Sequence, residues 1–201
     1  MTYYTLSDPC TATLEIKKSQ FLGFGYPIDS REQLMFHVEQ LRNQYPDARH
    51  VCYGYIIGDP HNTTSAGFDD DGEPSGTAGK PILNVLQHKG IGNCVVIVVR
   101  YFGGIKLGAG GLTRAYSSTA QAVVDNMNLH AFVPLSVIII ETDFANESFV
   151  RHTLEGFSAT ILKVDYGKNV FLTIETAQKS VQALSEKIGF YGNVKASEEP
   201  K

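Results

Sequence analysis

The sequence predicts an α+β protein of two domains, residues 1–130 and residues 135–201. Short apolar or alternating runs of strand length are interspersed with segments in which apolar residues recur at helical spacing. Pro134 follows the last helical segment of the first part, so the boundary is expected within residues 129–134. Beyond it the predicted order is strand, helix, two-strand hairpin and helix, which is the ferredoxin-like plan on one antiparallel sheet.

Composition indicates a folded chain without a general affinity for nucleic acid. The 201 residues are 43% hydrophobic and 19% charged, which is enough apolar material for one large core or two smaller ones. The net charge of −4 excludes a chain that is basic as a whole, so an anion site must be a local patch. Sequence-specific DNA binding is not expected.

The cysteines and the apolar runs indicate a cytoplasmic protein that does not enter a membrane. Cys10, Cys52 and Cys94 are few, odd in number and far apart, which fits a reducing compartment. The first residues show neither a basic start nor an apolar signal segment. The longest apolar runs, 94–99 and 137–140, are far shorter than the roughly 20 residues that span a bilayer.

In the first domain, residues 1–10 are expected to form a loose tail, and Ser30 with Gln33 forms a capping box that starts a helix. That helix presents one apolar face, and residues 43–46 end it. Residues 93–101 form a continuous apolar strand, expected at the centre of a sheet and covered on both faces. The remaining expected strands are 12–16, 20–28, 49–57 and 65–68, and the remaining helices are 81–88 and 112–128.

The second domain shows no chemistry in its sequence, and its uncovered sheet face is a candidate docking surface for a partner. A tight turn at 166–169 joins its hairpin, and residues 196–201 are expected to be frayed. The expected strands are 135–142, 159–166, 169–176 and 189–195, and the expected helices are 145–155 and 177–188.

Charge is segregated within residues 51–124, which indicates where function lies. Residues 51–73 contain acidic residues and no Lys or Arg, whereas residues 74–124 contain no Asp or Glu. The cations of this second stretch are Lys80, Lys89, Arg100, Lys106 and Arg114.

A glycine-rich loop joins the 93–101 strand to the next helix. Backbone N–H groups and the helix dipole gather at such a point and favour an anion. The alternative is that the glycines only allow a tight turn and a close helix–sheet contact. Tyr101 and Phe102 could stack on the bases of a nucleic acid. The alternative is that Phe102 packs in the core and Tyr101 lines the edge of the sheet. The candidate anion-binding or nucleic-acid-binding residues are Lys80, Arg100, Tyr101, Gly103, Gly104, Lys106, Gly108, Gly110, Gly111 and Arg114.

Standard nucleotide-binding templates do not fit this region. The third glycine of a dinucleotide fingerprint is absent after Gly110, and Pro74 and Pro81 occupy positions that a P-loop needs for Gly and for Ser or Thr. His50 and Cys52 alternate on one strand, so their side chains face the same side of the sheet. We favour a core residue beside a hydrogen-bonded polar residue. A pair of metal ligands, or a Cys52 nucleophile with His50 as its base, is less favoured. We therefore predict no catalytic residue and no cofactor.

An acidic loop precedes the glycine-rich stretch and consists of Asp70, Asp71, Gly72 and Glu73. Its carboxylates could hold a hard cation, but Pro74 excludes an EF-hand. We favour three other roles for these carboxylates. They are exposed to solvent, or they cap the backbone of the neighbouring glycine turn, or they pair with Arg100 or Arg114. No metal site is predicted.

Two long motifs carry a family resemblance. DDGEPSGTAGKP at 70–81 and VVRYFGGIKLGAGGLTRAY at 98–116, with Arg49, His50 and Cys52 in the pattern, resemble the IMPACT family. The resemblance is strong over the first 130 residues. Residues 135–201 resemble the small domain that bacterial members append, which is similar to the last domain of the translocase elongation factor.

The resemblance implies a two-layer α/β fold for the first domain, as in a ribosomal protein of the small subunit and in the GHMP kinases. Eukaryotic relatives regulate translation initiation through an additional N-terminal domain that this sequence does not show, so their competition for a kinase activator is not expected here. The kinases hold phosphates at a glycine-rich loop, but no Ser-Ser pair follows the glycines of residues 103–114. Kinase activity is not expected.

Three hypotheses of function remain open. The first is a non-catalytic binding protein of translation or its regulation, which contacts RNA, the ribosome or a translation-related protein through the basic strand–loop–helix. The alternative is an enzyme that acts on a small phosphorylated substrate, with Asp70, Asp71 or Glu73 holding magnesium or acting as a base. The third is a protein–protein module that docks through the second domain.

Overall fold

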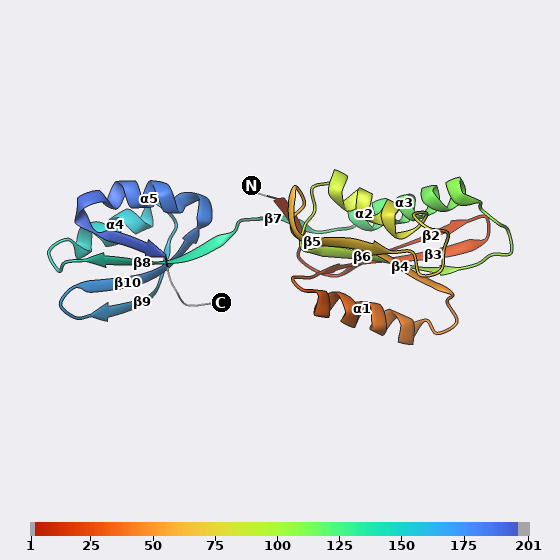
Figure 1. Ribbon diagram of the computed structural model, residues 1–201, viewed down its shortest axis with the longest axis horizontal. Helices are drawn as coiled ribbons and strands as arrows, with labels where there is room; N and C mark the ends of the chain where they lie inside the picture. The colour runs from red at the N-terminus through yellow and green to blue at the C-terminus, as the bar shows by residue number, and fades with distance from the viewer. Residues whose placement is uncertain (1–2, 197–201) are drawn as a thin grey trace. The chain divides into compact units, whose positions relative to one another are not determined.

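The computed structural model of the protein describes residues 3–196 (Figure 1). The chain separates into two compact units, Met1–Phe132 and Val133–Lys201. We call them the first and the second unit. Among the described residues, no helix is both long and apolar enough to cross a membrane.

The main sheet of the first unit is antiparallel, with the described strands in the order β2-β3-β6-β4-β5. Its central strand, β6, buries all residues except the last. Because both of its neighbours pair with it along its length, the apolar run is shielded at both edges as well as on both faces. The strands are β2 Cys10–Ile16, β3 Ser19–Pro27, β4 His50–Asp59, β5 Asn62–Asp69 and β6 Cys94–Tyr101.

Helices cover this sheet on both faces, so the unit has three layers and not the expected two (Figure 1). Helix α1, Arg31–Gln44, packs on one face against Val95, Ile97 and Val99 of β6. Helices α2, Gly79–His88, and α3, Ala109–Asp125, pack on the other. The physical reason is that β6 is apolar on both sides, and each side needs a cover.

The N-terminal residues do not form the expected loose tail. Residues Tyr3–Leu6 form strand β1, which pairs antiparallel with β7, Leu129–Phe132, in the segment where the domain boundary was expected. Tyr3 stacks on Phe132, with ring centroids 4.8 Å apart, and receives a hydrogen bond from Asn93. The pairing joins residues more than 120 positions apart, and a local sequence pattern carries no sign of it.

Element boundaries shift at several other places. The short strand expected at 65–68 is the longer β5, and the helix expected at 81–88 starts two residues earlier. Helix α3 was expected at 112–128 but begins at Ala109, because Gly108 takes a φ of +71° that turns the chain into the helix. As a result, Gly110 and Gly111 lie in the first turn of the helix and not in the loop.

The second unit contains one antiparallel sheet in the order β11-β8-β10-β9 and one core. Helix α5 starts at Val181, after a 3₁₀ turn, and not at 177. The last strand includes Ala196, which was expected to be frayed, and residues 197–201 lie outside the described residues. The elements are β8 Leu135–Thr142, α4 Glu147–Glu155, β9 Thr160–Tyr166, β10 Val170–Ala177, α5 Val181–Ile188 and β11 Asn193–Ala196.

Truncation of Leu6 tests whether β1 is part of the folded core. Its side chain is 2% exposed and packs in the same core as α2 and α3. We expect Leu6→Ala to lower the free energy of unfolding by about 2–5 kcal/mol, measured by urea denaturation. Tyr4→Ala is the control, because Tyr4 is 54% exposed, and its effect should stay within about 0.5 kcal/mol. Equal, small effects of both changes would contradict a structural role for β1.

Candidate functional site

The acidic loop is built into the fold through Asp70. Its carboxylate accepts hydrogen bonds from the backbone N–H groups of Gly76, Ala78 and Gly79 at 2.6, 3.0 and 2.8 Å. Ala78 stands at the N-cap of α2 and has no side chain that could cap it, so Asp70 supplies the cap from outside the helix. The carboxylate of Asp70 is therefore occupied by backbone donors.

Asp71 is held by a second set of contacts. One carboxylate oxygen accepts from Arg42 at 2.8 Å, and the other accepts from the N–H of Val51 at 2.7 Å. The residue has a φ of +40°, a strained conformation for a residue other than glycine, which these contacts maintain. Gly72 follows with a φ of +82° and completes the turn.

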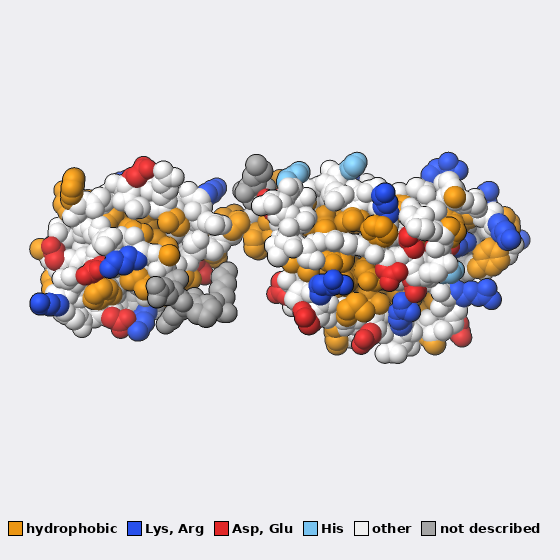
Figure 2. All heavy atoms as spheres, viewed as in Figure 1, with side chains coloured by type: hydrophobic (Ala, Val, Ile, Leu, Met, Phe, Trp, Pro, Cys, Tyr) orange, Lys and Arg blue, Asp and Glu red, His pale blue; other side chains and the backbone are white. Residues whose placement is uncertain are grey.

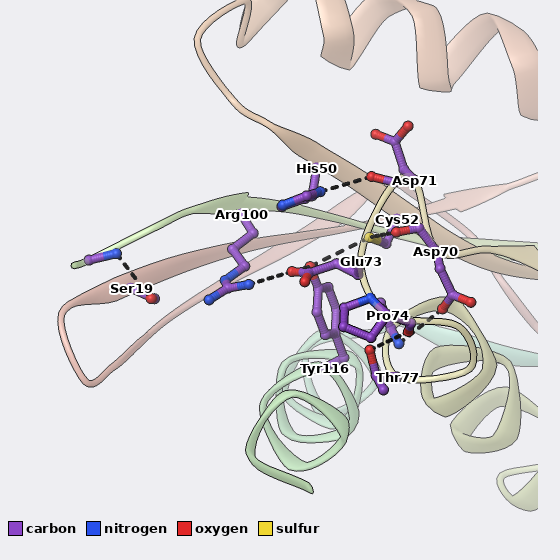
Figure 3. Close-up of polar contacts among 12 residues, drawn as sticks. Ser19, His50, Cys52, Asp70, Asp71, Glu73, Pro74, Thr77, Arg100 and Tyr116 are labelled. Atoms are coloured by element: carbon purple, nitrogen blue, oxygen red, sulfur yellow. Dashed lines mark hydrogen bonds and ion pairs between the residues drawn. The ribbon is translucent and has the colours of Figure 1, made fainter. Parts of the chain in front are cut away.

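Glu73 turns inward and forms a buried ion pair. Its Oε1 accepts hydrogen bonds from Nη1 of Arg100, on β6, and from the hydroxyl of Tyr116, on α3, the latter at 2.9 Å (Figure 3). Glu73 is 9% exposed and Arg100 is 6% exposed. Burial raises the pKa of Tyr116 well above its ordinary value, so the phenol stays protonated and donates to the carboxylate. This contact ties the acidic loop to the central strand and to α3.

The guanidinium of Arg100 lies between aromatic rings. Its Cζ is 5.4 Å from the ring centre of Phe21 and 5.7 Å from that of Phe102. Glu73 engages Nη1, whereas Nε is buried and finds no hydrogen-bond partner within residues 3–196. An unsatisfied donor on a buried cation is costly and rare, and a bound ligand, ion or water is one explanation for it.

Cys52 and His50 both face the acidic loop from β4. The thiol of Cys52 donates to the carbonyl of Asp70 at 3.0 Å, and burial raises its pKa, so it is a protonated core group and not a nucleophile. Nδ1 of His50 lies 2.8 Å from the carbonyl oxygen of Asp71. A carbonyl can only accept, so Nδ1 carries the proton, and in the neutral ring Nε2 is left as an acceptor.

A pocket of about 420 Å³ opens above the ion pair. The buried Arg100 and Glu73 form its bottom, while Phe102, 52% exposed, and Lys106 stand at its rim. Among the described lining residues, three are Arg or Lys and one is a carboxylate, which Arg100 already neutralises. The lining residues are Arg49, His50, Glu73, Pro74, Arg100, Phe102, Lys106, Leu107, Gly108, Ala109 and Leu112.

The N-terminus of α3 borders this pocket. Gly108 is its N-cap and offers no side-chain acceptor, and no acidic residue stands in the first turn. The N–H groups of Ala109, Gly110 and Gly111 thus precede the first intrahelical bond, which runs from Leu112 to the carbonyl of Gly108. Unoccupied N–H groups and the helix dipole favour an anion at this position.

The structure brings together only part of the candidate set. Arg100, Lys106 and Gly108 line the pocket, whereas Tyr101 packs with the α1 core on the opposite face of the sheet. Lys80 lies in the first turn of α2 and does not line the pocket. Arg114 and Gly111 line a second, smaller pocket of about 180 Å³.

The glycines of the loop divide by role. A Cβ at Gly103 would collide with the backbone of Lys18, and its N–H donates to Ser19 at 3.1 Å, so this glycine is required for the close approach of two loops. Gly104 has a φ of +84° with open space around it, which is a turn requirement.

Two residues that line the pocket were missing from the candidate set, Arg49 and His50. His50, the first residue of β4, and Arg49, which precedes the strand, both line the pocket, although the sequence favoured a satisfied polar role for His50. Their link to the loop depends on register, because His50 is the direct cross-strand partner of Arg100. The motif that contains Arg49 and His50 was the available signal. Within residues 3–196, no cluster of three or more His, Cys, Asp or Glu side chains is placed to hold a metal ion.

Fold and pocket together define an α+β protein with a cationic pocket at a helix N-terminus. A sequence model described as the Impact N-terminal domain matches residues 17–124. The chain belongs to the IMPACT family.

The relatives include a bacterial protein that matches along most of its length. IMPACT family member YigZ of Escherichia coli is 35% identical over 180 residues, which are 90% of this chain and 88% of that protein. A crystal structure titled as that of a hypothetical protein is 32% identical, covers 99% of this chain and 98% of its own, and has a TM-score of 0.71. A structure of the two-domain translational regulator Yih1 is 29% identical over 61% of this chain and 46% of its own, with a TM-score of 0.34.

A pair of variants tests the buried ion pair. Glu73→Ala should lower the free energy of unfolding by about 3–5 kcal/mol, because it leaves the guanidinium of Arg100 buried without a counter-charge. The double variant Glu73→Met with Arg100→Met should cost less than Glu73→Ala, since no buried charge remains. Urea denaturation measures both. A double variant that costs as much as Glu73→Ala, or more, would contradict this account.

Proposed function

We propose that the protein is a non-catalytic binding protein of translation or its regulation that contacts RNA or the ribosome through the pocket at the N-terminus of α3. The observation that carries the proposal is Arg100. It is a buried cation at the bottom of an open pocket, and part of its guanidinium has no protein partner within the described residues.

The surroundings of Arg100 support a phosphate ligand. Arg49 and Lys106 add positive charge at the wall and rim, and the first-turn N–H groups of α3 add donors. Lys and Arg side chains also gather at the end of the first unit that carries the β2–β3 turn and the loop before α3 (Figure 2). The exposed ring of Phe102 at the rim provides a surface on which a base can stack.

The translation setting comes from the family. Yih1 is described as a two-domain translational regulator, and we extend that setting to this chain as part of the proposal. A cytoplasmic location belongs to the same proposal, and the free cysteines Cys10, Cys52 and Cys94 support it.

The fold assignments are proposals of the same kind. In the second unit, the order β11-β8-β10-β9 with two helices supports the ferredoxin-like plan, because the last strand stands beside the first and the third beside the second. For the first unit we retain the likeness to the ribosomal-protein and GHMP-kinase fold, with α1 as a further layer.

One observation favours the alternative, an enzyme that acts on a small phosphorylated substrate. His50 lines the pocket, and the carbonyl of Asp71 fixes its tautomer so that Nε2 can accept a proton. A magnesium ion held by Asp70 and Asp71 is disfavoured, because their carboxylates already accept hydrogen bonds from backbone N–H groups and from Arg42. Turnover of a phosphorylated compound that is lost in His50→Ala would favour the enzyme.

Charge reversal tests RNA binding by its dependence on salt. With about four phosphate contacts, the logarithm of the binding constant for single-stranded RNA should fall against the logarithm of salt with a slope near −3. Fluorescence anisotropy with a labelled RNA between low and moderate salt measures that slope. Lys106→Glu with Arg114→Glu should weaken binding strongly and flatten the slope, because two of the cations at the pockets are reversed.

Lys80→Glu with Lys89→Glu is the matched control. This variant changes the net charge by the same amount, but neither Lys80 nor Lys89 lines either pocket at α3. Equal weakening by the two pairs would show a nonspecific charge effect, and binding that does not respond to salt would contradict the proposal.

A further inference from the structure

Two cationic pockets share Leu107 as a lining residue. The larger is the pocket above the ion pair, and the smaller, of about 180 Å³, shares Leu107 with it as a common wall. Lys17 and Arg114 bring positive charge to the smaller pocket, and its described lining contains no carboxylate. The lining residues of the smaller pocket are Ile16, Lys17, Leu107, Gly111, Arg114, Ala115 and Ser118.

The larger pocket ends at a closed bottom. Arg100 and Glu73 lie there almost without exposure, and behind them stand Phe21 and Tyr116, each 0% exposed. A polymer cannot continue through this bottom, so the end of a strand is the part of an RNA that can fill the pocket down to Arg100. The volume of about 420 Å³ lies in the range of pockets for small ligands and suits a single nucleotide.

The charges of the two pockets also differ in a way that fits two kinds of phosphate. A terminal phosphate monoester carries nearly two negative charges at pH 7, whereas a phosphodiester carries one. The larger pocket has the guanidinium of Arg100 at its bottom, together with Arg49, Lys106 and the first turn of α3. The smaller pocket is formed by the exposed Lys17 and Arg114 and fits the single charge of a diester.

We propose that the larger pocket binds the terminal phosphate monoester of an RNA strand and that the smaller pocket binds the next phosphodiester. The proposal rests on the proposed RNA-binding function and narrows it to the recognition of strand ends. In this arrangement Leu107 separates the two phosphates, and Phe102 at the rim stacks on the terminal base.

The test compares three RNAs of one sequence by fluorescence anisotropy: one with a 5′-phosphate, one with a 3′-phosphate, and one with hydroxyls at both ends. Each carries its dye within the strand, and the purified full chain is used. One of the two phosphorylated RNAs should bind about tenfold tighter or more than the hydroxyl RNA, the size of a charge-assisted hydrogen bond. Which of the two it is identifies the strand end.

Variants assign the two pockets without disturbing the buried ion pair. Arg49→Ala with Lys106→Ala should reduce the preference for the phosphorylated end, because Arg100 and the first turn of α3 then remain as its phosphate contacts. Lys17→Ala with Arg114→Ala should weaken all RNAs equally and leave binding of adenosine 5′-monophosphate, measured by calorimetry, unchanged. Lys80→Ala is the control and should change neither the preference for the phosphorylated end nor the affinity for the three RNAs.

The outcomes separate the two proposals. Equal affinity for phosphorylated and hydroxyl RNAs, with binding still dependent on salt, would overturn end recognition and leave the proposed function in place. Absence of binding to any of the RNAs would overturn both. Loss of the end preference in Lys17→Ala with Arg114→Ala would overturn the assignment of the two pockets.

Discussion

The buried ion pair between Glu73 and Arg100 is the interaction on which the candidate site depends. A guanidinium at 6% exposure is tolerated in a core only if a counter-charge accompanies it, and Glu73 is that counter-charge. Because the same carboxylate oxygen also accepts from Tyr116, the central strand, the acidic loop and helix α3 are fixed relative to one another. The pocket has its shape because these three elements meet at one oxygen atom.

The segregation of charge along the sequence is explained by this arrangement. The acidic loop satisfies the fold: Asp70 caps the turn before α2, Asp71 holds Arg42 and Val51, and Glu73 neutralises Arg100. Lys106 belongs to residues 74–124, which contain no Asp or Glu. It forms no ion pair among the described residues and lies at the rim of the pocket. A cation without a carboxylate partner can attract an anionic ligand, which is the physical basis of both proposals.

Local patterns predicted most elements of the fold but not their long-range pairing. The apolar run of β6 indicated a central strand covered on both faces, and Ser30 caps α1 as its motif predicts. The sequence could not reveal that β1 pairs with β7, since that depends on contacts between distant segments. The cover on both faces of β6 was predicted from its apolar run, whereas the two-layer fold that the family resemblance implied was wrong for this unit. For the site, the motifs located Arg100, Lys106 and the acidic loop. They could not separate Tyr101 from Arg100, because that requires knowing which face of the sheet each residue takes.

The central claim is that Arg100, braced by Glu73, is the phosphate contact at the bottom of the pocket. The most direct measurement is a nuclear magnetic resonance titration of the labelled protein that follows the Nε–H signal of Arg100. Adenosine 5′-monophosphate should shift this signal and the amides of residues 109–111, whereas adenosine should not, because it lacks the phosphate. An Arg100 signal that stays in place while the nucleotide shifts other residues would contradict the account.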